Sequence, residues 1–372
     1  MLNLSPTSRT DRPSANGARR RRALSRYVAR QAGKKGYSFE PGALAGPEGL
    51  IGGAAVALLV AVALVLRRPD FAWAPYAAFW TCLADPGGGM TRRLRVMTAF
   101  IVCGGLVAGL VSAFAAPSGL ASGALLSALV GLLIYVGLSS SGMGGVGVLV
   151  GVVAVVAAEQ PVGAADAVMG ALVFFLGGAL TMILCLATVA CVPPTRRSPR
   201  EDRAPPADPR ALSHAVLAAI AVMATYTAVH ALSLAYPQWA TVAAVVVVRP
   251  DVHASRRRTI ERVAGSLIGA AAAAPLILAV KESWALVPPI FLLAAAAITL
   301  RKVNYTLFVS FLTPLFIVIG ATMVPSLAHQ AAASRAEDNM IGSVLATLGC
   351  ALVWGGWRLV GARMPRRLKT SG

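Results

Sequence analysis

Apolar runs recur along this chain from residue 49 to residue 357, and most approach the length that crosses a bilayer as one helix. A bilayer core of about 30 Å needs about 20 apolar residues in an α-helix. Lipid offers the backbone no hydrogen-bond partners, so such runs must be helical. Hydrophobic residues make up 57% of the 372 positions and charged residues only 13%, which is too apolar for a soluble protein of this length. The chain is therefore predicted to be an all-α polytopic membrane protein.

The apolar runs divide into twelve predicted transmembrane helices, six in each half of the chain. In the first half they cover residues 49–66, 69–84, 96–114, 119–138, 142–158 and 166–192. In the second half they cover residues 211–232, 234–248, 262–280, 284–300, 305–323 and 339–357. The predicted organisation is a basic, disordered cytoplasmic tail (1–48), a first six-helix repeat (49–192), a Pro-rich and charged cytoplasmic linker (193–210), a second six-helix repeat (211–358) and a basic cytoplasmic tail (359–372).

The formal net charge of +19 is divided unevenly between alternate loops. If the N-terminus is cytoplasmic, the opposite side keeps only Arg67, Arg68, Lys281 and Arg335. Lys and Arg favour the cytoplasmic side of membrane proteins, so the pattern places both termini there. We therefore expect a multi-pass protein of the bacterial cytoplasmic (inner) membrane. Its basic tails are expected to meet membrane lipid and not nucleic acid.

Two segments of the first half recur in the second half at constant spacing. The first set of matches is Trp73 with Trp239, Asp85 with Asp251, and Arg92 with Arg258. The second set is Asp166 with Asp338, Gly170 with Gly342, Gly177 with Gly349, and Leu180 with Leu352. Because each half is predicted to begin and end in the cytoplasm, a duplication would give two parallel six-helix repeats.

The second span of each half is only about 15 residues long and contains a proline, Pro75 or Pro237. Short or Pro-interrupted segments at matching positions in two halves are typical of transporter binding sites. Each span ends at an acidic residue, Asp85 or Asp251. A tight loop is predicted to follow, PGGGMT in the first half and VHAS in the second, before a cluster of arginines.

The arginine clusters are predicted to form a cationic vestibule that concentrates anions, or else simply to anchor the topology. Arg262 is set apart because small residues follow it and permit close helix packing, so it is predicted to face the interior. Trp239, Tyr305 and Thr313 could offer rings and a hydroxyl to an aromatic acid, or anchor the helices at the interface. The candidate substrate-binding residues are Arg92, Arg93, Arg256, Arg257, Arg258, Arg262, Trp239, Tyr305 and Thr313.

A second group of ionisable residues is a candidate for coupling or gating. Asp166 and Asp338 open the sixth spans, where capping of the helix is the alternative. A histidine in a membrane helix is a candidate proton carrier, with a structural role as the alternative. The candidates are Asp85, Asp251, Asp166, Asp338, Arg335, His214 and His230.

Enzyme signatures do not occur in the sequence: there is no HExxH, GxSxG, Walker A lysine loop or DxxxD pair. We therefore expect no enzymatic activity, no cofactor and no metal. Without a nucleotide site, active transport would draw on the proton gradient or on the gradient of the substrate itself.

The stretch from Tyr236 to Gly269 resembles the signature of the fusaric acid resistance (FUSC-like) family of the aromatic acid exporter superfamily. The resemblance is carried by Trp239, Pro250, Asp251, Arg256, Arg257, Arg258, Arg262, Gly265 and Gly269. The stretches YTLFVSFLTPLFIV and RAEDNMIG add to it, whereas the first half offers only LADPGGGMTRRLR. The resemblance implies an exporter of aromatic or other small organic acids, driven by the proton motive force.

Two alternatives remain open on the sequence. Twelve helices in two parallel halves also describe a major facilitator transporter, although the distance from Asp85 to Arg92 is too long for that family's loop. A non-transporting scaffold or accessory subunit of an envelope enzyme is the second alternative. The sequence leaves open whether copies of the chain associate into a homo-oligomer.

Overall fold

The computed structural model describes residues 45–115, 119–191, 207–249, 251–279 and 282–323, with scattered residues between 338 and 348. Within these ranges the chain is all-helical, as predicted. In chain order the helices are α2 (Gly46–Leu66), the 3₁₀ turn η2 (Pro69–Ala72), α3 (Trp73–Ala84), α4 (Met90–Phe114), α5 (Leu120–Ser139), α6 (Gly144–Ala158), α7 (Ala164–Cys191), α8 (Ala211–Ala231), α9 (Pro237–Val247), α10 (Val252–Ala279), the 3₁₀ turn η4 (Ser283–Leu286), α11 (Val287–Leu300) and α12 (Tyr305–Met323).

In the described part of the chain, eight helical segments are long and apolar enough to cross a membrane. They are α2, α4, α5, α7, α8, α10, α12, and η4 together with α11. Each predicted span from 49–66 to 305–323 overlaps one helix, and the last, 339–357, falls almost wholly outside the described residues. The described part of the chain is therefore all-α and has the apolar helices of a multi-pass membrane protein.

Two helices begin well before the spans predicted for them. α4 starts at Met90 and α10 at Val252, so the arginine clusters lie in their first turns. The predicted spans were too short because apolar residues alone defined them and the arginines marked their limits. Arginine nevertheless is a good helix former, and its side chain reaches from an apolar surface to water. VHAS is consequently the start of α10, and the prediction of a loop there is wrong. PGG does form a loop, in which Gly87 and Gly88 take φ values of 70° and 81°.

The second helix of each half is short. α3 has 12 residues and α9 has 11, or roughly 16–18 Å at 1.5 Å per residue, less than the hydrocarbon core. Pro237 opens α9 and Pro75 lies in the first turn of α3. Proline is tolerated there because the first N–H groups of a helix have no internal acceptor. The prolines therefore begin these helices and do not interrupt them.

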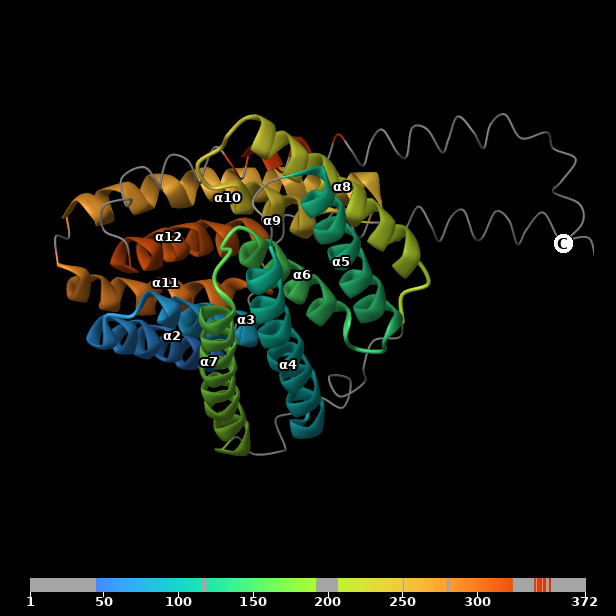
Figure 1. Cartoon of the computed structure of the whole chain (residues 1–372). Helices are drawn as coiled ribbons and strands as arrows, with labels where there is room; N and C mark the ends of the chain where they lie inside the picture. The colour runs from blue at the N-terminus through green and yellow to red at the C-terminus, as the bar shows by residue number, and fades with distance from the viewer. Residues whose placement is uncertain are drawn as a thin grey trace, which may run out of the picture. The chain divides into compact units, whose positions relative to one another are not determined.

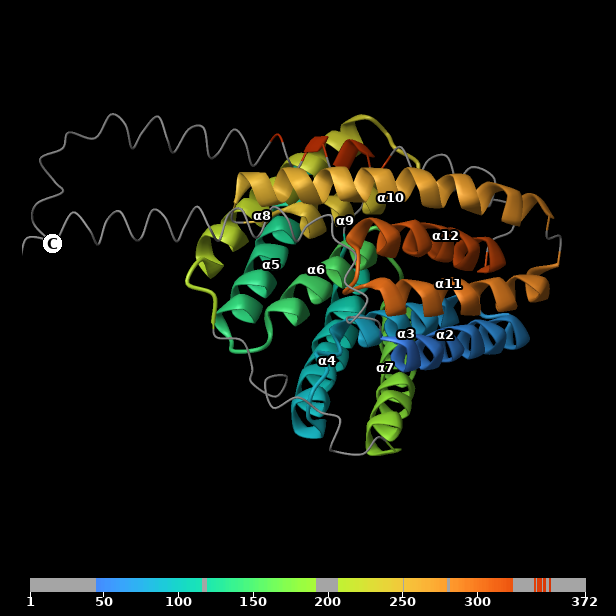
Figure 2. The same cartoon turned by 180° about the vertical axis from the view of Figure 1, so that it is seen from behind.

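Helices of the two halves pack against each other. α2 lies beside α11, and α5 lies beside α8 (Figure 1). Within the halves, α4 packs on α7 and α6, and α10 packs on α12 (Figure 2). Glycine brings α2 close to α11, because a Cβ on Gly53 would lie 2.8 Å from the carbonyl oxygen of Phe291. Small residues of this kind let membrane helices approach closely.

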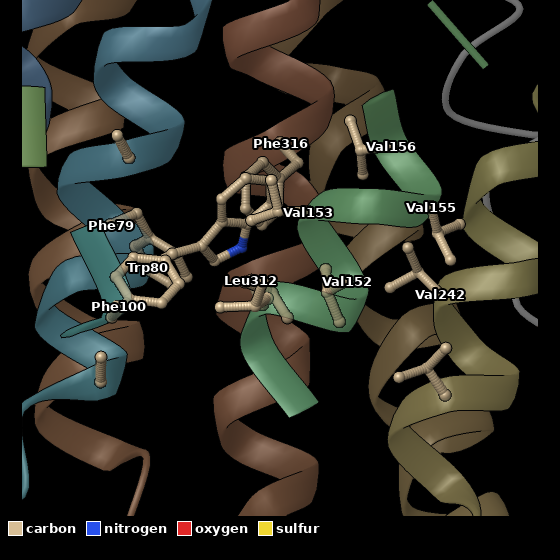
Figure 3. Packing of buried hydrophobic residues seen from close by; sticks show 14 of the residues in the cluster. Phe79, Trp80, Phe100, Val152, Val153, Val155, Val156, Val242, Leu312 and Phe316 are labelled. Carbon is tan, nitrogen blue, oxygen red and sulfur yellow. The ribbon is translucent and has the colours of Figure 1, made fainter. Parts of the chain in front are cut away.

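An aromatic and valine cluster fills the space where α3, α6 and α12 meet (Figure 3). Trp80 of α3 packs against Phe316 of α12, with ring centroids 6.2 Å apart. Val152 and Val153 of α6 belong to the same cluster and are buried. This packing fixes one wall of the cavity described next.

Candidate functional site

A cavity of about 490 Å³ opens among α3, α5, α6, α8, α9, α10 and α12. Small-molecule sites in proteins fall in the range of about 300–1,000 Å³. Both halves of the chain contribute lining residues, with α3, α5 and α6 from the first half and the remaining helices from the second. The cavity is apolar and aromatic over most of its wall, and cationic on one side.

The aromatic wall comes from three helices. Trp80 belongs to α3, Trp239 to α9, and Phe308 and Phe316 to α12. Phe316 joins the two indoles, since its ring centroid lies 5.8 Å from that of Trp239 and 6.2 Å from that of Trp80. These separations are those of interacting aromatic rings. The wall therefore offers ring surface to a planar apolar ligand.

The cationic side of the cavity carries Arg249, Arg258 and Arg262. Arg258 and Arg262 are four residues apart on α10, a spacing that places both on one face of a helix. Arg249 stands in the turn between α9 and α10. Ser255 holds this turn, because its Oγ accepts from the Arg249 N–H at 2.9 Å and donates to the Arg249 carbonyl oxygen at 3.2 Å.

Tyr305, the first residue of α12, orients two of these arginines. Arg262 Nη1 donates to Tyr305 Oη at 3.2 Å. The guanidinium carbon of Arg258 lies 3.1 Å from the centroid of the same ring, a cation–π contact. One side chain thus fixes two guanidinium groups before a ligand arrives.

Positive charge exceeds negative charge around the cavity. Among the described residues that line it, none is an aspartate or a glutamate. Glu261 lies outside the lining, 2.9 Å from Arg257 and 3.9 Å from Arg258. Burial and then the charge of Arg258 lower the pKa of Arg249, and an arginine nevertheless stays protonated in a protein. Like charges that are fully or partly buried are costly until an anion joins them, so the site favours an anionic ligand.

Residues 214–349 match a family model described as fusaric acid resistance protein-like. The chain carries a fusaric acid resistance protein-like region. The resemblance predicted from the sequence is thereby confirmed, and that family is one of membrane transport. Together with the apolar helices, the match indicates a transporter-type membrane protein. Comparisons with curated proteins and with solved structures found no match.

The fusaric acid resistance protein-like region supplies the whole cationic side of the cavity. Of the predicted binding residues, Arg258, Arg262, Trp239 and Tyr305 line it. His214, the first residue of the matched region, lines it too and donates from Nε2 to the carbonyl oxygen of Val248 at 3.0 Å. This bond ties α8 to the turn that carries Arg249.

The other predicted binding residues lie outside the lining. Arg93 makes a buried ion pair with Asp85, and Arg257 pairs with Glu261. Thr313 packs against α10, where a Cβ on Gly269 would lie 2.8 Å from the Thr313 Cβ. Arg92 is partly exposed and Arg256 is exposed.

The predicted coupling residues are dispersed. Asp85 lies in its ion pair, and Asp251 is exposed and accepts from the Ala254 N–H at 3.1 Å, as a helix cap does. Asp166 is exposed in the first turn of α7, and Asp338 is buried. Arg335 lies outside the described residues. His230, outside the cavity lining, lies beside Glu159.

Sequence reasoning missed Arg249, Trp80, Phe308, Phe316 and Glu159. Arg249 directly precedes the Pro-Asp of the signature, and that position was the available signal. Trp80 and Glu159 belong to the first half but act beside residues of the second. Nothing in their own surroundings in the sequence points to those contacts.

Proposed function

We propose that the chain exports aromatic or other small organic acids across the bacterial inner membrane, driven by the proton motive force. The observation that carries this proposal is the cavity, which joins an aromatic wall to three guanidinium groups. A carboxylate attached to a ring has the same two parts. A fixed pair of guanidinium groups suits a carboxylate, because arginine can bind it through two parallel hydrogen bonds.

The proposed binding mode follows from the positions of the lining residues. The carboxylate lies between Arg258 and Arg262, where Tyr305 already holds both guanidinium groups. The ring of the substrate lies against Trp239 and Phe316. Because the arginines are positioned beforehand, binding orders few side chains and costs less free energy.

We further propose that the chain consists of two parallel repeats (49–192 and 211–358), joined by the cytoplasmic linker 193–210. The helix contacts support this, because several contacts recur between matching helices. The contact of α2 with α11 matches that of α8 with α5, and the contact of α4 with α6 matches that of α10 with α12. In this topology twelve helices cross the membrane, both termini and their tails are cytoplasmic, and the arginine side of the cavity faces the cytoplasm.

Uptake by proteoliposomes of a labelled aromatic carboxylate, benzoate, tests the function. The purified protein is expected to move benzoate, and Arg262→Ala is expected to lower the rate because the carboxylate loses a charged partner. Hydrogen bonds to charged groups contribute about 1.5–3 kcal/mol, which corresponds to roughly a tenfold to hundredfold loss in apparent affinity.

Arg95→Ala is the matched control, since Arg95 is an exposed arginine of α4 outside the cavity lining. Its rate is expected to equal that of the wild type. If the wild-type protein moves neither benzoate nor other organic acids, the transport proposal is wrong and a scaffold role gains support.

A further inference from the structure

A carboxylate and an imidazole meet at a second place, away from the arginines. Glu159 follows the last residue of α6, and His230 lies in the last turn of α8. Glu159 Oε2 lies 3.5 Å from His230 Nε2, with 11% and 22% of the two side chains exposed. The pair joins a helix of the first half to a helix of the second.

The hydrogen bond of the other ring nitrogen, Nδ1, indicates whether the contact between His230 Nε2 and Glu159 needs a proton. His230 Nδ1 lies 2.9 Å from the carbonyl oxygen of Tyr226, which can only accept a hydrogen bond. Nδ1 therefore carries a hydrogen, and in a neutral ring Nε2 would turn a lone pair toward the carboxylate of Glu159. Two acceptors at this separation repel each other. A proton between Nε2 and Oε2 removes the repulsion and makes an attractive contact.

The surroundings of Glu159 also favour a bound proton. Its Oε1 is buried and has no hydrogen-bond partner among the described residues. Burial raises the pKa of Glu159, and the neighbouring His230 opposes that rise. A carboxyl group in this position takes up a proton more readily than one in water.

Few other ionisable groups face the pair. On α8, the ring of Tyr226 stacks on the imidazole, with centroids 4.1 Å apart. Within the described helices, α6 and α9 carry no ionisable side chain and α5 carries only Tyr135. α4 carries Cys103 and the arginines of its first turns, and Asp166 of α7 is exposed. Among the described residues of these helices, Glu159, His230 and Tyr226 are therefore the ionisable groups that meet here.

The pair lies at the opposite ends of helices that also line the cavity. Val152 of α6 and His214 of α8 are lining residues. At 1.5 Å per residue, Glu159 lies roughly 10 Å beyond Val152 along α6, and His230 lies roughly 24 Å beyond His214 along α8. A change at the pair can thus alter the relative position of two helices that line the cavity.

We propose that Glu159 and His230 form a proton-binding site that ties α6 to α8 at the ends of these helices distant from the arginines. A proton from water binds between Nε2 and Oε2 and closes the contact. When it returns to water, the carboxylate faces a lone pair and the helix ends repel. No other bond forms or breaks. The use of this site to drive export rests on the proposed function, whereas the proton site itself does not.

The pH dependence of thermal stability tests the site without any transport measurement. The folded protein holds the proton more tightly than the unfolded chain does, so the stabilisation is present at acidic pH and is lost as the pH rises and the proton leaves. The Tm of the wild type relative to Glu159→Gln is expected to fall by roughly 2–4 °C between pH 5 and about pH 9. His230→Gln is expected to give the same trend, and the double variant to add nothing further.

Glu282→Gln and His253→Gln are the controls, because both residues are exposed and lie outside the pair and the cavity. Neither is expected to change the pH trend. Tm differences that stay constant with pH, or that add fully in the double variant, would overturn the proton site. The two single variants test it separately, so a folding failure in one leaves the other informative.

Benzoate accumulation in proteoliposomes with an imposed pH gradient tests the coupling. Glu159→Gln is expected to keep benzoate exchange at equal pH and to lose accumulation driven by the gradient. If accumulation persists, the pair does not couple transport. If the wild type moves no benzoate while its Tm still follows the predicted pH trend, the proposed function fails and the proton site stands.

Discussion

Single side chains decide the charge and the shape of the cavity. Tyr305 is the most informative of them, because its hydroxyl accepts from Arg262 and its ring lies under Arg258. A tyrosine offers these two contacts through different atoms. Substitutions can therefore separate them.

Tyr305→Phe removes the hydroxyl and keeps the ring. Arg262 then loses a positioned acceptor while Arg258 keeps its cation–π contact, and the KM for benzoate is expected to rise roughly tenfold. Tyr305→Leu removes both contacts and is expected to raise the KM further. Both values come from initial rates of uptake in proteoliposomes.

Tyr135→Phe is the matched control, since Tyr135 is an exposed tyrosine on α5. A Tyr305→Phe variant with the wild-type KM would show that the hydroxyl does not position Arg262 for the substrate. A KM that rises equally in Tyr305→Phe and Tyr305→Leu would remove the role assigned to the ring.

At the scale of helices, a buried ionic contact closes the turn between α3 and α4. Asp85 caps α3 and pairs with Arg93 of α4, and both side chains are almost fully buried. Asp85 Oδ1 also accepts from the Gly87 N–H at 3.0 Å. Arg301, in the turn after α11, donates to the backbone carbonyl oxygens of Cys82 and Asp85. This cluster joins the two halves where the first short helix ends.

Asp85→Asn is expected to destabilise the protein by about 3–5 kcal/mol, because it leaves the Arg93 charge buried without its carboxylate. Thermal unfolding of the purified protein followed by circular dichroism measures the loss. The double variant Asp85→Leu, Arg93→Met replaces both charges with apolar groups and is expected to recover much of the stability. Equal losses in the two variants would show that the ion pair is not the source.

The helices could be predicted from the sequence more completely than the residues of the site. Each long apolar run within the described residues is a helix, because lipid leaves the backbone no other way to satisfy its hydrogen bonds. Arg258, Arg262 and Tyr305 were identified as candidates because the signature and the helical spacing lie within one continuous stretch. Trp80 and Glu159 were not, because their partners lie more than sixty residues away, in the other half. Such contacts arise from the packing of α3, α6, α8 and α12 and leave no local pattern.

At the scale of the whole molecule, the proposed parallel arrangement of the halves would fix the side from which an anion reaches the arginines. Parallel repeats would place the ends of α3 and α9 on the same side of the membrane, and the loops rich in arginine would make that side cytoplasmic. An inverted arrangement would place the two ends on opposite sides.

Single cysteines in a cysteine-free background can distinguish the two arrangements. Thr91 lies in the first turn of α4 and Asp251 just before α10, and both residues are exposed. Thr91→Cys and Asp251→Cys are both expected to react with a membrane-impermeant maleimide only when the cytoplasmic side is accessible. Gln160→Cys, next to Glu159 and exposed, is expected to react only from the other side. Labelling of Thr91→Cys and Asp251→Cys from opposite sides would overturn the parallel repeat, because one of the two short helices would then run the other way.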